Sequence, residues 1–150
     1  MARLLVIAHA PLASALQAVA AHIFPDAALA MAVCDVSAEQ APEVVEQHAA
    51  ALLAAFDAAD ELLILTDVFG ATPCNVARRL GDRPNARVLV GVNVPMLWRA
   101  LGHLHEPLDK LAALAVAGAT QGVMQLASSR PQNQAQKPVN HDPDHHQHQQ

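Results

Sequence analysis

The chain has 150 residues, 53% hydrophobic and 15% charged, which is long and apolar enough to bury the core of one compact domain. Its formal net charge of −5 and its 3% of aromatic residues argue against a basic or base-stacking surface for nucleic acid. No apolar run is long enough to enter a membrane as a spanning helix, and the spacing of Cys34 and Cys74 favours neither a metal site nor a disulfide framework, so we expect a cytoplasmic protein.

The first predicted element is a strand that ends at a histidine. Residues 4–8 form a continuous rather than an alternating apolar run, which is typical of a strand buried on both faces of a parallel sheet. His9 follows directly, and Pro11 then opens a helical pattern over residues 12–24. Open α/β folds hold their reactive groups at this end of a strand, so His9 is a candidate for chemistry.

The second unit has the same order of strand and helix. We predict a strand over residues 29–34 and a helix over residues 42–59, with Ser37 and Gln40 in a capping-box pattern ahead of Pro42. Asp35 directly follows this second strand. We expect it to form a turn or a helix cap, with an acidic or phosphoacceptor role as the alternative.

The third unit carries a carboxylate to the end of a buried strand. Asp67 follows the apolar run 62–66 by one position, just as His9 follows its own run, so the two residues should lie at similar depth. Adjacent strands lie ~4.8 Å apart, which brings the two side chains within reach of each other if these strands are neighbours. A carboxylate bound to one ring nitrogen fixes the tautomer and leaves the other nitrogen free to act as a base or a phosphoryl acceptor.

The segment after Asp67 has the composition of an anion-binding turn. Gly70 and Ala71 allow close approach, Thr72 adds a hydroxyl, and a helix is predicted over residues 73–80. Free amides at a helix start suit a phosphoryl group. The alternative is an ordinary strand-to-helix turn capped by Thr72.

The remaining pattern completes a doubly wound α/β sheet. A strand is predicted over residues 88–92, a helix from Pro95, and a last helix over residues 108–118. His103 and His105 are two positions apart and would not share a helical face, and we predict no metal site. We expect one domain over residues 1–126 and a disordered tail over residues 127–150, which are rich in Gln, Asn, Pro and His.

Three segments, residues 6–10, 66–75 and 91–97, resemble the mannose-family IIA component of the bacterial phosphoenolpyruvate-dependent sugar phosphotransferase system. The resemblance extends over roughly residues 3–126. It implies an open sheet of four parallel strands in the order 2-1-3-4. It also implies a homodimer in which a fifth, antiparallel edge strand, here residues 122–126, is exchanged between subunits.

The resemblance also implies roles for individual residues. His9 corresponds to the phosphorylated histidine, with Nε2 as the modified atom, and Asp67 corresponds to the aspartate that orients its ring. Thr72 and the amides near Gly70 and Ala71 would receive the phosphoryl oxygens. Further candidates for lining the site are Ala10, Phe69, Asn93, Pro95 and Met96.

The activity implied is that of a phosphotransferase component with a phosphohistidine intermediate and no cofactor. It would take a phosphoryl group from the carrier protein HPr and pass it to a IIB component, with IIC and IID components in the membrane. One alternative is a regulatory phosphoprotein, or the related phosphotransferase subunit of dihydroxyacetone kinase. A noncatalytic flavodoxin-like or response-regulator-like module is disfavoured because the first strand is followed by neither a hydroxyl-rich loop nor acidic residues, and a hydrolase would lack a nucleophile beside His9.

Overall fold

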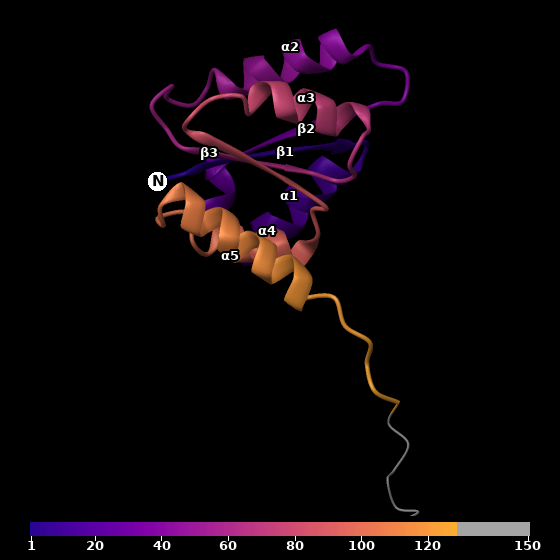
Figure 1. Cartoon of the computed structure of the whole chain (residues 1–150), viewed down its shortest axis with the longest axis vertical. Coiled ribbons are helices and arrows are strands. Elements are labelled where there is room, and N and C mark those ends of the chain that lie inside the picture. The colour runs from indigo at the N-terminus through magenta and orange to yellow at the C-terminus, as the bar shows by residue number, and fades with distance from the viewer. Residues whose placement is uncertain (129–150) are drawn as a thin grey trace, which may run out of the picture.

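The computed structural model describes residues 1–128 as a parallel sheet between two layers of helices (Figure 1). The order of the strands in the sheet is β2-β1-β3-β4, and all three pairings are parallel, as predicted. The strands are β1 (Arg3–His9), β2 (Met31–Val36), β3 (Leu62–Thr66) and β4 (Ala86–Val90).

The helices divide between the two faces of the sheet (Figure 1). One face is covered by α1 (Leu12–Ile23), α4 (Val94–Leu101) and α5 (Leu108–Gln121). The other face is covered by α2 (Pro42–Leu53) and α3 (Thr72–Leu80). A short 3-10 helix, η1 (Ala27–Ala30), leads into β2.

The central strand β1 is buried on both sides, which explains its uninterrupted apolar sequence. Leu4, Val6 and Ala8 pack into the core beneath α1, α4 and α5. Leu5 and Ile7 pack into the second core, beneath α2 and α3. This double burial fixes the register of β1 and therefore the position of the residue at its end.

Several element boundaries differ from the sequence prediction, and three of the differences have a structural cause. The helix predicted to reach residue 59 ends at Leu53, because residues 54–60 turn back towards β3. The second strand begins only at Met31, because the preceding residues form η1. The fourth strand ends at Val90 rather than residue 92, since Gly91 has a φ of +90° and the N–H groups of Gly91 and Val92 both donate to the carbonyl of Thr66.

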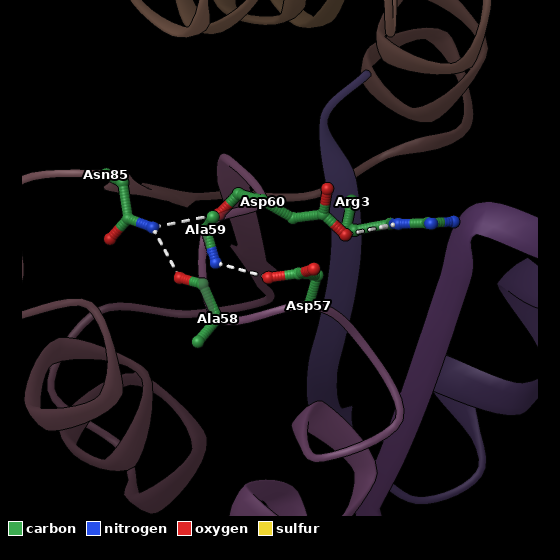
Figure 2. Close-up of polar contacts among 6 residues, drawn as sticks. All are labelled: Arg3, Asp57, Ala58, Ala59, Asp60 and Asn85. Carbon is green, nitrogen blue, oxygen red and sulfur yellow. Dashed lines mark hydrogen bonds and ion pairs between the residues drawn. The ribbon is translucent and has the colours of Figure 1, made fainter.

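Figure 2 shows a polar network at the end of the sheet where β1 begins. His9 lies at the other end of β1. The Arg3 guanidinium binds the Asp60 carboxylate at 2.9 Å. The Asn85 amide donates to the carbonyls of Ala58, at 3.2 Å, and Asp60, at 2.8 Å. The side chain of Asp57 accepts the N–H of Ala59 at 2.9 Å. These bonds anchor the loop before β3 to the starts of β1 and β4.

The segment that follows α5 carries exposed apolar side chains. Residues 123–128 have no regular secondary structure in the single chain. Val123, Met124 and Leu126 are 74%, 68% and 82% exposed. An exchanged strand needs a second subunit, so the fifth strand at residues 122–126 stays a prediction.

The boundary of the domain also stays a prediction, and most of the proposed tail lies outside the described residues. Among residues 1–128, no helix combines the length and the apolar character needed to span a membrane.

Candidate functional site

The ends of β1 and β3 bring a histidine and an aspartate into direct contact. The distance between His9 Nδ1 and Asp67 Oδ2 is 2.7 Å. The same carboxylate oxygen accepts the peptide N–H of His9 at 3.0 Å, and Oδ1 accepts the N–H of Val68 at 2.9 Å. Asp67 therefore holds both the ring and the main chain of His9, and the predicted contact between the two side chains is confirmed.

The environment of Asp67 keeps its carboxyl ionised. Partial burial raises the pKa of Asp67, but hydrogen bonds from the His9 peptide, the His9 ring and the Val68 peptide outweigh that effect. The pKa of Asp67 is therefore lower than its ordinary value of 3.8. Because an ionised carboxylate can only accept hydrogen bonds, Nδ1 of His9 carries the proton in this contact.

The His9 ring is held on one side and open on the other. Its side chain is 49% exposed, whereas the side chain of Asp67 is only 14% exposed. With Nδ1 bonded to Asp67, the neutral ring has its lone pair on Nε2. This arrangement is suited to a nucleophile that must meet an incoming group at the protein surface.

The loop after Asp67 leads into a helix whose first turn has no side-chain cap. Gly70 adopts a φ of +85°, a conformation that favours glycine. Thr72 is the first residue of α3, and Ala71 occupies the cap position without a side-chain hydrogen bond. The alternative of a turn capped by Thr72 is therefore not what forms. The first turn of α3 has no acidic residue, so its amides are suited to an anion.

The helix that follows His9 starts differently. The Asp35 carboxylate accepts the N–H of Ser14 at 3.1 Å and the hydroxyl of Ser14 at 2.5 Å. Asp35 lies within β2 rather than directly after the strand, as the sequence had suggested. It caps α1, one of the two roles expected for it, and it places a negative charge at the amino end of that helix. The local sequence pattern did not pair Ser14 with Asp35, because the contact joins residues that are far apart in the chain.

Other candidate residues fall into two groups. Ala10 and Phe69 are exposed beside His9 and Asp67 in the chain, and the Phe69 side chain is 76% exposed. The remaining three make their contacts with α4 and α5. Asn93 caps α4 by accepting the N–H of Met96 at 2.9 Å, Met96 is buried in the core, and Pro95 packs against Gly122. Their proposed place in the site remains untested.

The sequence matches a known family over most of its length. A family model described as the PTS system fructose IIA component, EIIA-man, matches residues 3–116. The mannose-specific EIIAB component of the PTS system of Escherichia coli strain K12 is 35% identical over 107 residues. That alignment covers 69% of this chain and 33% of the relative, so the chain spans about a third of the relative's length.

Solved structures agree with this match. The mannose/sorbose-specific IIA subunit from Enterococcus faecalis has a TM-score of 0.76 at 28% identity, covering 84% of this chain and 95% of that chain. Component EIIA from Streptococcus agalactiae has a TM-score of 0.72 at 22% identity, covering 83% and 97%, and at this identity it supports the fold alone. From the family match over residues 3–116, the chain belongs to the mannose-type family of phosphotransferase-system IIA components.

Proposed function

We propose that this chain is a phosphocarrier that accepts a phosphoryl group on Nε2 of His9 from the phosphohistidine of HPr and passes it to a IIB component. The observation that carries the proposal is the 2.7 Å contact between His9 Nδ1 and Asp67, which leaves Nε2 on the open side of a half-exposed ring. The family match supports the same activity.

The transfer balances without a cofactor. The lone pair on Nε2 of His9 attacks phosphorus in line, while the phosphorus–nitrogen bond of the donor breaks and its electron pair returns to the donor's ring. Positive charge develops on the His9 ring, and the Asp67 carboxylate stabilises it. The uncapped amides at the start of α3 and the Thr72 hydroxyl receive the phosphoryl oxygens. In the transfer to IIB, His9 is the donor. The bond between phosphorus and Nε2 breaks as IIB attacks, and its electron pair returns to the His9 ring.

The surface around His9 favours a protein as the donor. Four hollows lie elsewhere on the described chain, near Arg3, Arg79 and Trp98, and neither His9 nor Asp67 lines any of them. Val68 and Phe69, directly after Asp67, are 51% and 76% exposed. An exposed nucleophile beside exposed apolar side chains fits docking of a second protein better than enclosure of a small molecule.

The proposal places the protein in the cytoplasm and includes a homodimer. The dimer is supported by β4, an edge strand of the described sheet, and by the exposed apolar side chains of residues 123–126. An unpaired edge and an apolar strand-like segment are complementary if the segment comes from a second copy. The IIC and IID membrane components would be linked to this chain only through IIB. A purely regulatory output would use the same chemistry at His9 but no transfer to IIB.

Intact mass spectrometry tests this function. The chain is mixed with phosphoenolpyruvate, enzyme I and HPr from the same organism, and then with its IIB component. We expect an acid-labile phosphoryl adduct that His9→Ala loses, that His22→Ala keeps because His22 is exposed on α1 away from the strand end, and that IIB removes. Absence of the adduct while HPr is phosphorylated, or its persistence in His9→Ala, would refute the proposal.

A further inference from the structure

We propose that Asp35 is a positioning residue for phosphoryl transfer, and that it acts on His9 through Ser14 and the start of α1. This inference rests on the proposed function of His9. Asp35 lies on β2, whereas Asp67, which binds the ring, follows β3. The two carboxylates therefore come from the two strands that flank β1.

The link from β2 to α1 consists of two hydrogen bonds. Asp35 Oδ1 accepts the N–H of Ser14 at 3.1 Å, and Oδ2 accepts the Ser14 hydroxyl at 2.5 Å. The hydroxyl oxygen also lies 3.1 Å from the carbonyl oxygen of Pro11. Asp35 thus accepts from both hydrogen-bond donors of Ser14, a residue in the first turn of α1 that contacts the turn after His9.

The main chain next to His9 is attached to the same part of β2. His9 pairs with Val36 in the sheet register, and the N–H of Ala10 donates to the carbonyl of Val36 at 2.9 Å. The turn formed by residues 9–11 is consequently held at its start by Val36 and at its end by Asp35 through Ser14. Loss of the second attachment would let the turn, and the ring that it carries, take up a range of positions.

The charge of Asp35 has a second effect on the position of the phosphoryl group. Two helices begin close in sequence to the reactive pair, α1 after His9 and α3 after Asp67. The amino end of α1 is capped by a carboxylate, whereas that of α3 has neither an acidic residue nor a side-chain cap. An incoming anion is therefore directed to α3, where Thr72 lies, rather than to α1.

Kinetics of single variants test the proposal. Ser14→Ala removes the hydroxyl without changing charge, and Asp35→Asn removes the negative charge and replaces one of the two acceptor oxygens that bind Ser14 by a donor. Matched controls are Ser128→Ala and Asp26→Asn, which change exposed residues away from these contacts. We expect the rate constant of transfer from bound phospho-HPr to His9 to fall about tenfold in both variants, with the KM for HPr unchanged, because a small misplacement of reacting atoms is costly.

Two further variants separate positioning from general stability. Ser14→Thr keeps a hydroxyl at the same place and should retain the wild-type rate. The double variant Ser14→Ala, Asp35→Asn should be no slower than Asp35→Asn alone, because both changes break one link. A lower melting temperature with an unchanged transfer rate would mean that the link is merely structural and would overturn the proposal.

The NMR signals of the His9 ring nitrogens give a readout that needs no phosphoryl donor. We expect a single ring environment in the wild type and in the two controls, and exchange-broadened or shifted ring signals in Ser14→Ala. Wild-type ring signals in both Ser14→Ala and Asp35→Asn would refute positioning by Asp35 even if His9 is phosphorylated. Conversely, altered ring signals in a protein that HPr does not phosphorylate would leave the positioning intact and show that the proposed function is wrong.

Discussion

At the scale of single residues, one oxygen of Asp67 binds both the ring and the peptide N–H of His9. A variant that removes the negative charge of this carboxylate tests its role. Asp67→Asn keeps the shape but loses the negative charge that offsets the charge developing on the ring. We expect phosphoryl transfer to His9 to slow by about a hundredfold, in line with the loss of one electrostatic stabiliser in other enzymes. Rapid-quench measurement of the phosphorylated fraction checks this.

The control for that variant is Asp82→Asn, which changes an exposed carboxylate at the end of α3. It should transfer at the wild-type rate. Equal rates in Asp67→Asn and the wild type would show that the negative charge of Asp67 has no part in the reaction.

The lowered pKa of Asp67 makes a prediction about stability and pH. A carboxyl whose pKa is lower in the folded than in the unfolded chain binds fewer protons when folded, so it stabilises the fold above the unfolded pKa of about 3.9. That contribution is lost as the pH falls through the lower, folded value. Such titrations usually begin near pH ~5. As the pH is lowered from there towards the folded pKa of Asp67, we expect the difference in unfolding free energy between the wild type and Asp67→Asn to shrink.

Carboxyl-carbon NMR titration of the folded protein is the direct measurement. Asp67 should titrate below its ordinary value of 3.8, and His9→Ala should raise its pKa by removing the donor on the ring. A midpoint at or above the ordinary value in the wild type would mean that burial outweighs the hydrogen bonds.

At the scale of elements, the chain offers a matched pair of glycines for testing the start of α3. Gly70, before α3, has a φ of +85°, and Gly91, after β4, has a φ of +90°. A Cβ at either position would meet nothing within 4 Å, so substitution by alanine changes only the backbone energy. Both Gly→Ala variants should therefore lose stability by a similar amount, about 1 kcal/mol, in chemical denaturation.

Only one of these two variants should affect the chemistry. Gly70→Ala alters the loop that presents the α3 amides, so we expect it to slow phosphoryl transfer, whereas Gly91→Ala should transfer at the wild-type rate after correction for the unfolded fraction. Equal effects on transfer would indicate that the loop at Gly70 does not receive the phosphoryl group.

The same elements show what a sequence can and cannot predict. The strands ending at His9 and Asp67 were recognisable because burial on both faces leaves an uninterrupted apolar run, and the next polar residue then marks the strand end. The end of α2 was not recognisable, because residues 54–59 have no local helix-breaking glycine or proline. Part of what ends the helix is tertiary, since Phe56 lies 5.3 Å beneath the Arg3 guanidinium. The other part is a local turn, in which Asp57 binds the N–H of Ala59.

Leu29 gives a second example of the limit. Its apolar neighbours suggest a strand, yet it is 81% exposed in η1, because nothing in a local pattern distinguishes the last turn before a strand from the strand itself. The bond between Ser14 and Asp35 was equally hidden. It depends on β2 lying directly beside β1, and that neighbour relation belongs to the sheet and not to either segment.

At the scale of the whole molecule, the segment after α5 is the part that a single chain leaves unsatisfied. Most of the surface of its apolar side chains is exposed, in Val123, Met124 and Leu126. Burial of these side chains would stabilise the protein. The edge of β4 is open to a further strand in the described sheet. We therefore expect the full chain to be a dimer at micromolar concentration in analytical ultracentrifugation.

Two truncations identify the segment responsible. A chain that ends after Gln121, the last residue of α5, loses the apolar segment and should sediment as a monomer. A chain that ends after residue 128 keeps the segment but lacks the polar tail, and it should remain a dimer. If both truncations dimerise, the interface lies on the helices or strands of the folded domain. If the full chain is a monomer, residues 122–126 do not form an exchanged strand, and the site at His9 must then act within one subunit.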